Sequence, residues 1–313
     1  MDSSSGSDRI AFVGLGSMGL PMAINLQNYL KSQDKEPLIV YNRTTSKTES
    51  VVEIGAITAE SLDQVVERAN IIFTSLANDD AVNQVYDELL KSSRSNNEKN
   101  AIFIEMSTIY PTTIANIKER VEKIPNRHII CCPVWGPPIS AKEAQLVIIT
   151  SGNQAAIEHV MPLLIPVLGK KTISIGEDVT KGVTFKLTGN FFIAGIIELL
   201  SEGMTLSEKT GIGRDKLMEF VDLFFPFGSF QNYGRKMQND TFSTDVGFTV
   251  TNSLKDVDHM RHLAAEYECP LPVIDIVHQH LISAKANNGE NYDWSSIVGV
   301  LRIAAGLPFV KKE

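Results

Sequence analysis

Three closely spaced glycines near the amino terminus constrain the fold of this chain more than any other feature of its sequence. They stand in the run Gly14, Leu15, Gly16, Ser17, Met18 and Gly19, which follows the apolar stretch Ile10 to Val13 and opens a helix-like pattern. In a strand-to-helix turn, the first glycine permits a tight bend, the second lets a pyrophosphate approach the backbone, and the third lets the helix pack closely on the strand. This order predicts a dinucleotide-binding turn, with an ordinary glycine-rich turn as the alternative.

Short apolar runs rich in Ile and Val continue this pattern through the first half of the chain. They are Ile10 to Val13, Leu38 to Tyr41, Ile71 to Leu76, Ala101 to Ile104, His128 to Cys132 and Leu146 to Thr150. Runs of this kind are typical of buried parallel strands. Between them lie helix starts, such as a capping box at Ser61 to Gln64 and a proline suited to a first helical turn at Pro111. Strands that alternate with helices predict an α/β, Rossmann-type doubly wound sheet.

The second half of the chain has a different character, because the strand-like runs stop after Gly176. Helical patterns cover roughly Lys181 to Thr210, Arg214 to Phe224, Leu254 to Tyr267 and Pro272 to Ala286. We therefore expect a dinucleotide-binding domain over residues 1–178 and an all-α domain over residues 179–313, joined by the first of these helices. Most members of an aromatic group in the second half are expected in the core, and the alternative is that their segment approaches the substrate site. The group consists of Phe224, Phe225, Phe227, Phe230 and Tyr233.

Charge and hydropathy exclude several classes of protein. The 313 residues carry 29 Lys and Arg against 37 Asp and Glu, and the basic residues do not cluster, so no nucleic-acid partner is expected. The longest apolar run, Phe191 to Ile197, is closed by Glu198, so no membrane-spanning segment is expected. Met1 to Asp8 resembles a loose tail rather than a targeting signal, and Ser92 to Asn100 a surface loop. With three cysteines in no metal-binding spacing, the expected location is cytoplasmic.

The end of the second predicted strand bears on the choice of cofactor. It reads Tyr41-Asn42-Arg43-Thr44 and contains no acidic residue. An Asp or Glu at this place hydrogen-bonds the ribose of NAD, whereas a guanidinium with nearby hydroxyls accommodates the 2′-phosphate of NADP. Asn42, Arg43 and Thr44 therefore predict NADP(H) as the cofactor, and a solvated surface arginine is the alternative.

Several further segments, taken with the glycine turn, resemble the β-hydroxyacid dehydrogenase family. Gly14 to Leu26, GLGSMGLPMAINL, is similar to the opening signature of that family, and Thr180-x-Gly182-x-x-x-Lys186-x-x-x-Asn190 is close to its catalytic segment. Leu76, Ala77 and Asn78 stand at its Leu-Pro cofactor loop, Glu105 to Thr108 with Pro111 resemble its Asp-x-Ser-Thr-x-x-Pro, and Lys255-Asp256 resemble its late Lys-Asp pair. The family includes 3-hydroxyisobutyrate dehydrogenase and succinic semialdehyde/glyoxylate reductases, and is more distantly similar to 6-phosphogluconate dehydrogenase.

The resemblance covers the chain from Ile10 to about Gly306 and implies an oxidoreductase with a Rossmann domain, a helical second domain and a homodimer or larger homo-oligomer formed through it. It implies that Leu76, Ala77, Asn78, Thr108 and Lys255 join the glycine turn in binding the cofactor. It also implies an acid/base role for Lys186 and a positioning role for Asn190.

Lys186 and Asn190 also stand out on physical grounds. They are four residues apart on a predicted helix, so they project from one face. Hydride transfer to a carbonyl leaves charge on oxygen, which an ammonium can stabilise and protonate while an amide fixes the geometry. The segment around Lys186 is too apolar to offer a surface lysine an obvious place in solvent.

The predicted substrate loop departs from the family pattern. Where the family has Asp-x-Pro-Val-Ser-Gly-Gly, this chain reads Cys131-Cys132-Pro133-Val134-Trp135-Gly136-Pro137-Pro138. In the family the serine and the backbone N–H groups of the glycines hold a substrate carboxylate, and Pro137 has no N–H to give. Val134, Trp135, Gly136 and Pro137 are therefore predicted to contact an apolar, bulkier substrate, and the acceptance of a carboxylate is left open.

The leading hypothesis is an NADPH-dependent reductase of aldehydes or ketones with Lys186 as the general acid. One alternative is an imine reductase acting on an apolar substrate, and another is a catalytically weak NADP-binding scaffold or sensor. No metal is predicted, because His259 and His262, three residues apart on a predicted helix, lack an evident third ligand.

Overall fold

The computed structural model describes residues 8–93 and 100–311. Internal contacts divide the chain into two compact units, Met1–Lys186 and Leu187–Glu313, which are described separately below. The predicted tail at residues 1–8 and the predicted loop at residues 92–100 fall almost entirely outside the described residues.

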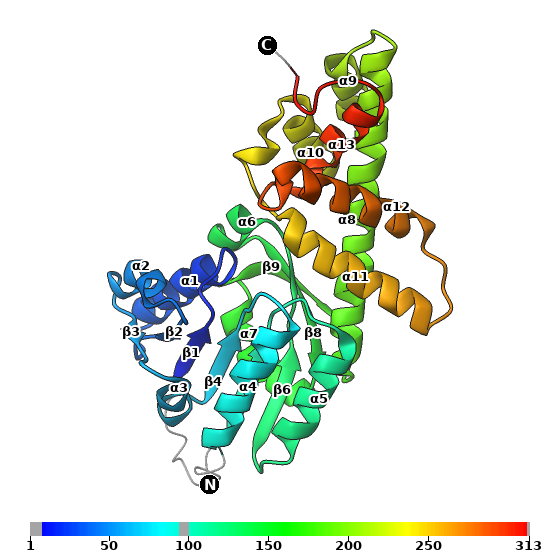
Figure 1. Cartoon of the computed structure of the whole chain (residues 1–313). Coiled ribbons are helices and arrows are strands. Elements are labelled where there is room, and N and C mark those ends of the chain that lie inside the picture. The colour runs from blue at the N-terminus through cyan, green and yellow to red at the C-terminus, as the bar shows by residue number, and fades with distance from the viewer. Residues whose placement is uncertain (1–7, 94–99, 312–313) are drawn as a thin grey trace. The chain divides into compact units, whose positions relative to one another are not determined.

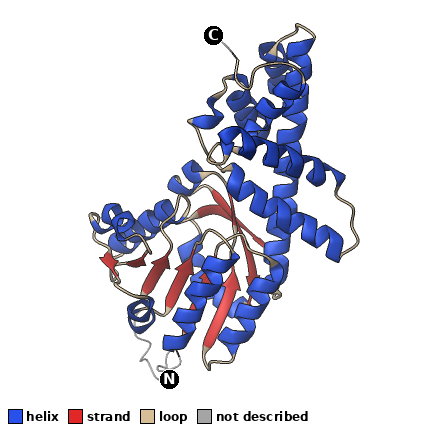
Figure 2. Cartoon of the chain, viewed as in Figure 1, coloured by secondary structure: helices blue, strands red, loops and turns tan. Residues whose placement is uncertain are grey.

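The first unit is built on a nine-stranded sheet with the order β3-β2-β1-β4-β5-β6-β8-β7, and β9 pairs with β8 (Figure 1; Figure 2). The strands are β1 (Ile10–Val13), β2 (Ile39–Tyr41), β3 (Ile57–Thr58), β4 (Ile71–Thr74), β5 (Ala101–Glu105), β6 (Arg127–Cys131), β7 (Val134–Trp135), β8 (Leu146–Gly152) and β9 (Gly169–Ser174). The six predicted strands are all present. The sheet thus confirms the expected doubly wound α/β architecture, in which the strand order reverses between β1 and β4.

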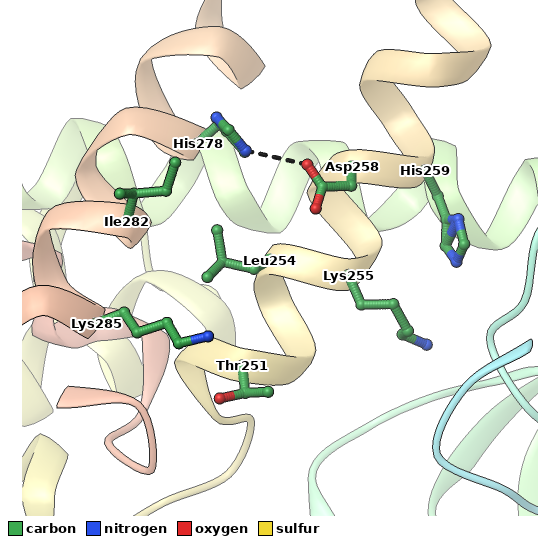
Figure 3. Close-up of a pocket in the computed structure, with 8 residues that line it drawn as sticks. All are labelled: Thr251, Leu254, Lys255, Asp258, His259, His278, Ile282 and Lys285. Atoms are coloured by element: carbon green, nitrogen blue, oxygen red, sulfur yellow. Dashed lines mark ion pairs between the residues drawn. The ribbon is translucent and has the colours of Figure 1, made fainter. Parts of the chain in front are cut away.

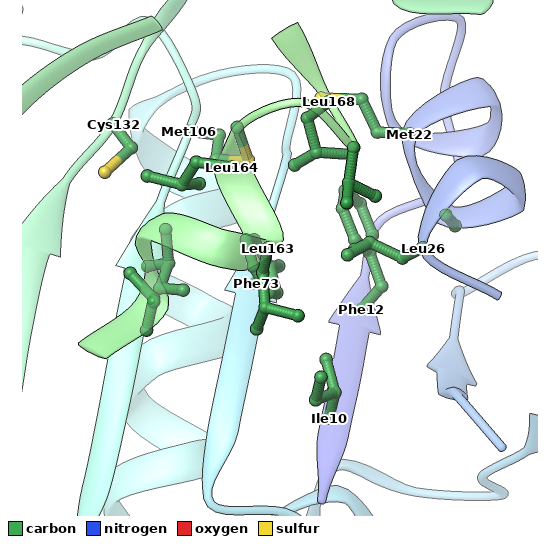
Figure 4. Packing of buried hydrophobic residues seen from close by; sticks show 14 of the residues in the cluster. Ile10, Phe12, Met22, Leu26, Phe73, Met106, Cys132, Leu163, Leu164 and Leu168 are labelled. Carbon is green, nitrogen blue, oxygen red and sulfur yellow. The ribbon is translucent and has the colours of Figure 1, made fainter. Parts of the chain in front are cut away.

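Helices cover both faces of this sheet, which is why central strands such as β1 and β4 are buried at every position. The helices are α1 (Gly19–Ser32), α2 (Glu49–Val52), α3 (Leu62–Arg68), α4 (Asp79–Ser93), α5 (Pro111–Glu122), α6 (Pro138–Lys142) and α7 (Gln154–Leu164), with a 3-10 turn η1 (Thr45–Thr48). Met22 and Leu26 of α1 and Leu163 and Leu164 of α7 pack on the face that includes Phe12 (Figure 4). Side chains of α3, α4 and α5 pack on the opposite face.

Two features of this unit differ from the sequence-based expectation. β8 runs antiparallel to β6 and to β7, whereas all the apolar runs were expected to be parallel strands. The chain between β7 and β8 contains only the five-residue helix α6, which is too short for the crossover that a parallel pair needs. The strands β3, β7 and β9 were not predicted, because they are short or carry exposed lysines, as Lys170 and Lys171 do in β9.

The second unit is helical. Its elements are most of α8 (Val179–Lys209), then α9 (Arg214–Phe224), α10 (Gly228–Gln238), η2 (Thr241–Ser243), α11 (Val250–Glu266), α12 (Pro272–Ala284), the π-turn η3 (Lys285–Gly289), η4 (Trp294–Ser296) and α13 (Ile297–Ala304). After Ser174 the described residues form no strand, apart from one bridge between Thr249 and Asp293. The helical second half is therefore confirmed, and α10 and α13 are additional helices that the sequence did not indicate.

The first two turns of α8 belong to the sheet-containing unit. Val179 and Val183 are buried in its core, and a Cβ on Gly182 would lie 2.2 Å from Oγ of Ser151 in β8. Only glycine permits this close approach of helix and strand. The close approach explains why the unit extends to Lys186, beyond the boundary at residue 178 that the sequence suggested.

By length and composition alone, α8 is apolar enough to cross a membrane, although no single run within it indicated this. Its buried residues, among them Leu187, Ala194, Ile197 and Met204, form the core of the helical unit. A helix that packs in a protein core can be as long and as apolar as a membrane-spanning helix, so length and composition do not distinguish the two.

Three of the five aromatic residues in the predicted group are on the surface, so the expectation that most of them lie in the core is wrong. Phe224 and Phe227 are 67% and 66% exposed, and Phe225 is 38% exposed. Phe230 and Tyr233 do pack against the helical core. The exposed group lies at the end of α9. Phe224 stacks on Phe220, and Phe225 meets Phe220 edge to face and stacks on Phe230.

Candidate active site

The glycine turn lies between β1 and α1 and has the geometry that a dinucleotide needs. Gly14 has a φ of +95°, and a Cβ there would lie 2.3 Å from the carbonyl oxygen of Ser75. A Cβ on Gly19 would lie 1.9 Å from the carbonyl oxygen of Gly14, whereas one on Gly16 would meet nothing within 4 Å. Gly14 and Gly19 are therefore required by the turn itself, and the exposed backbone at Gly16 and Ser17 is open to a ligand.

Met18 occupies the N-cap of α1 and supplies no side-chain hydrogen bond to the first turn. N–H groups at the start of a helix need acceptors, and a pyrophosphate supplies them. The turn therefore fits the diphosphate of a nicotinamide dinucleotide.

Of the three residues predicted to contact the ribose phosphate, Asn42 supports the glycine turn, whereas Arg43 and Thr44 are exposed. Oδ1 of Asn42 accepts a hydrogen bond of 2.9 Å from the backbone N–H of Leu15, so Asn42 anchors the glycine turn. Nδ2 of Asn42 donates to the carbonyl oxygen of Thr44 at 2.9 Å. Arg43 and Thr44 are exposed, and the Arg43 guanidinium makes no hydrogen bond or ion pair with the described part of the chain. Such an arginine is available to a phosphate.

The loops after β4 and β5 are bound to each other. The backbone N–H of Leu76 donates to Oγ of Ser107 at 2.8 Å. Asn78 accepts a hydrogen bond from the N–H of Ala81 at 2.9 Å, while Ala77 is exposed and Thr108 half-buried. The structure therefore places these four predicted cofactor residues, Leu76, Ala77, Asn78 and Thr108, on two connected loops at the carboxyl end of the sheet, where open α/β sheets bind their ligands.

Glu105, at the end of β5, is a buried acid beneath these loops, and sequence reasoning gave it no role. Its Oε1 accepts a 2.6 Å hydrogen bond from the N–H of Ser107, and its Oε2 accepts one of 2.7 Å from Oγ1 of Thr74. The hydroxyl of Tyr86 lies 3.1 Å from the same threonine oxygen. Burial raises the pKa of Glu105, while hydrogen bonds from Ser107 and Thr74 act in the opposite direction. The carboxyl connects the ends of β4 and β5. An acidic residue at the end of an otherwise apolar run was the feature of the sequence that could have identified Glu105.

The predicted substrate loop and Lys186 meet within the sheet-containing unit. Lys186 is 8% exposed, and its Nζ lies 5.6 Å from the centroid of the Trp135 ring. Phe185 contacts the same indole edge to face, with ring centroids 5.2 Å apart. Val134 is buried, whereas Gly136 and Pro137 are exposed at the start of α6. A cation, an indole and a phenyl ring thus gather at one place.

In the helical unit, Asn190 and Asp256 are brought together. Nδ2 of Asn190 donates to Oδ2 of Asp256 at 2.7 Å, and both side chains are buried. Nζ of Lys255 lies 3.2 Å from Oδ1 of Asp256. Asp256 was noticed in the sequence only as the neighbour of Lys255, but the structure shows that it fixes the amide of Asn190.

Lys255 also lines a pocket on the helical unit between α11 and α12 (Figure 3). The other lining residues are Thr251, Leu254, Asp258, His259, His278, Ile282 and Lys285. Asp258 forms an ion pair of 3.0 Å with His278, so acidic and basic groups are both present. Within the described residues, no group of three or more His, Cys, Asp or Glu is placed to hold a metal ion, and His262 is exposed.

These features define a class of protein, an NAD(P)-dependent oxidoreductase of the hydroxyacid dehydrogenase type. The family model for the NAD binding domain of 6-phosphogluconate dehydrogenase matches residues 9–176. The model for the NAD-binding region of NADP-dependent 3-hydroxyisobutyrate dehydrogenase matches residues 180–301. The chain belongs to this family of β-hydroxyacid dehydrogenases, as its sequence motifs suggested.

Relatives support the assignment over most of the chain, and a solved structure shows the same fold. An uncharacterised oxidoreductase, YfjR of Bacillus subtilis, is 31% identical over 94% of this chain and 100% of its own length. The NADH-dependent oxidoreductase ucdB of Aspergillus ustus is 28% identical over 93% and 98%. The structure of Mycobacterium tuberculosis 3-hydroxyisobutyrate dehydrogenase has a similar fold, with a TM-score of 0.81 and 21% identity over 95% of this chain and 100% of that one.

Proposed function

We propose that this protein uses NADPH to reduce the carbonyl group of an aldehyde or ketone, with Lys186 as the general acid. The observation that carries the proposal is a lysine only 8% exposed, in the unit that contains the glycine turn. A bound nicotinamide supplies a hydride to the carbonyl carbon. The oxygen then needs a proton, and Nζ of Lys186 is the group that we assign to donate it.

Asn190 is assigned to orient the substrate. It lies four residues after Lys186 on α8, so both project from one helical face. Its hydrogen bond to buried Asp256 limits rotation of the amide, which keeps one orientation ready before a substrate binds. A scaffold without catalysis would need neither this arrangement nor a buried lysine.

We infer NADPH rather than NADH from Arg43. Replacing Arg43 by alanine should weaken NADPH binding about 10- to 100-fold and leave NADH binding nearly unchanged, because a charged hydrogen bond to the 2′-phosphate is lost. Titration of both cofactors by fluorescence measures the effect. Arg68→Ala, which removes another exposed arginine of the same unit, serves as the control.

Equal affinity of the unmodified protein for NADPH and NADH would contradict this assignment. So would a preference for NADH, which is the cofactor in the name of the Aspergillus ustus relative.

The substrate is inferred from the loop after β7. Pro137 and Pro138 stand in succession and neither has an N–H group, so the loop offers few donors to a carboxylate. A charged substrate would lose water there without regaining the hydrogen bonds. An apolar carbonyl compound loses little water and gains about 25 cal/mol for each Å² buried against aromatic side chains.

NADPH oxidation with a panel of substrates tests the function. We expect 3-phenylpropanal to be reduced with a higher kcat/KM than succinic semialdehyde or glyoxylate. The double variant Trp135→Ser with Pro137→Gly should move the preference toward the two acids by about 10-fold, because a hydroxyl and an N–H are restored. If the unmodified protein prefers succinic semialdehyde or glyoxylate, the inference about the loop is wrong. If the protein reduces none of the carbonyl compounds, the proposed function itself is wrong.

We further propose that the protein acts as a homodimer or larger homo-oligomer. Phe192, Leu199 and Leu206 are each at least 60% exposed and recur at intervals of seven residues along α8. A stripe of this spacing is suited to pairing with another helix. The oligomeric state, like the cytoplasmic location, stays a prediction.

A further inference from the structure

Trp135 occupies the place where the family pattern has a serine, and the fold holds it firmly. It lies on β7 and pairs with Val147 of the antiparallel strand β8. Gly136, which follows, has a φ of +140°, and a Cβ there would lie 2.8 Å from the side chain of Leu146. The backbone on either side of the indole is therefore constrained, and the ring itself packs edge to face against Phe185.

The face of this ring is directed toward the proposed general acid. Nζ of Lys186 lies over the indole, 5.6 Å from the ring centroid. Tryptophan gives the strongest attraction of the three aromatic side chains for an ammonium within about 6 Å, and the attraction grows when water is excluded. Since Lys186 is buried, the indole helps to keep it in its charged form and to hold it in one position.

The polar edge of the same indole has a different property. Nε1 of Trp135 is buried and makes no hydrogen bond with any residue in the described part of the chain. A buried donor without an acceptor is unfavourable by about 1 to 3 kcal/mol, so a site normally satisfies it with water or ligand. The indole N–H is thus a donor in need of an acceptor, beside the lysine that we assign to proton transfer.

We propose that Trp135 is a positioning and specificity-determining residue. Its ring face holds the Lys186 ammonium, and its indole N–H donates a hydrogen bond to an acceptor atom of the substrate. The site thereby selects a neutral carbonyl compound over a cationic iminium. The inference rests on the proposed carbonyl reductase function. A serine at this position can donate a hydrogen bond, but it has no aromatic ring to hold the ammonium, so it cannot fill both roles of Trp135.

The selection follows from charge. A neutral carbonyl oxygen accepts a hydrogen bond from the indole N–H and a proton from the ammonium. A protonated imine has no lone pair on nitrogen to accept either, and it carries the same charge as Lys186. Like charges in a site sheltered from water repel strongly. The arrangement therefore disfavours the imine reductase alternative.

Two substitutions separate the ring face from the N–H. Trp135→Phe keeps an aromatic face and loses the donor, whereas Trp135→Leu loses both. Using NADPH and 3-phenylpropanal, we expect the leucine variant to lose activity at alkaline pH about 0.5 to 1 pH unit earlier than the unmodified protein, because its lysine is no longer stabilised as an ammonium. The phenylalanine variant should show less than half of that shift, but a kcat/KM about 5- to 10-fold lower at neutral pH.

A second measurement needs no turnover. The chain has two tryptophans, Trp135 and Trp294, and within residues 8–93 and 100–311 only Trp135 is paired with a lysine by a cation–π contact. We expect the fluorescence of the unmodified protein to change in an alkaline step that Lys186→Met removes. Lys181→Met, an exposed lysine on the same helix, should leave the step in place.

The outcomes distinguish the inference from the proposed function. If the fluorescence step is present but no carbonyl compound is reduced, the function fails while the Trp135–Lys186 contact stands. An unchanged alkaline limb in Trp135→Leu, with carbonyl reduction intact, overturns the positioning role and leaves the function standing. Faster turnover of protonated 2-methyl-1-pyrroline than of 3-phenylpropanal overturns the selection of neutral substrates.

Discussion

Replacing Lys186 by methionine is expected to lower kcat for carbonyl reduction by about 10²- to 10⁴-fold, which is the usual contribution of a general acid. Methionine keeps most of the aliphatic volume beside Trp135 and Phe185, so the loss should come from the missing ammonium and not from a cavity. The dissociation constant of NADPH should change less than about threefold, because binding is assigned to the glycine turn and Arg43. Stopped-flow reduction and cofactor titration measure the two quantities separately.

Lys181→Met is the matched control, since Lys181 is on the same helix, five residues before Lys186, and is exposed. It should retain the activity of the unmodified protein. Lys186→Met with kcat within about tenfold of the unmodified value would remove Lys186 from the proton-transfer step. Full loss of NADPH binding in the same variant would instead make Lys186 part of the cofactor site.

The sequence indicated the sheet well because its strands are buried on both faces. The strand Ile71–Thr74 is buried at every position and apolar up to Phe73, and few other structures explain that pattern. The same pattern carries no information on direction, because parallel and antiparallel buried strands have similar composition. The reversal of β8 depends on the short connection through α6, which is a property of chain length and not of strand composition.

One of the missed helices, α10, contains residues that disfavour a helix. Gly228 and Gly234 lie within its eleven residues, and glycine is the poorest helix former apart from proline. It is stabilised from outside: Met237 is fully buried, and Gly234 brings the backbone against the side chain of Met218. Tertiary packing of this kind has no signature within eleven residues of sequence.

At the candidate site, motif residues were predictable and their supporting residues were not. The glycine turn, Arg43 and Lys186 are recognisable because the chemistry requires these residue types at these spacings. Glu105 and Asp256 act through contacts with residues far away or on another element, such as Thr74 and Asn190. Their importance appears only when the fold brings the partners together. The exposed Phe224 and Phe227 show the opposite error, in which an apolar residue was assigned to a core that it does not join.

The buried carboxyl of Glu105 leads to a prediction about stability. Glu105→Ala should lower the free energy of unfolding by about 2 to 4 kcal/mol, because the N–H of Ser107 and the hydroxyl of Thr74 lose their acceptor at a fully buried position. Glu105→Gln should be much milder. Its amide oxygen can accept from Ser107, and its NH₂ can donate to Oγ1 of Thr74 if that hydroxyl donates fully to the carbonyl oxygen of Ile104, now 3.3 Å away.

The dependence of this effect on pH has a definite sign. Since burial raises the pKa of Glu105 in the folded protein, there is a range of pH above its ordinary pKa in which the folded chain binds the proton and the unfolded chain does not. In that range the stability of the unmodified protein falls as the pH rises. Glutamine has no such proton, so Glu105→Gln should gain stability relative to the unmodified protein between pH 5 and pH 8. Urea unfolding at both pH values measures the difference, and other titrating groups cancel in the comparison. If the stability of the glutamine variant instead falls relative to the unmodified protein as the pH rises, the carboxylate, and not the carboxylic acid, is the form that holds the loops after β4 and β5 together.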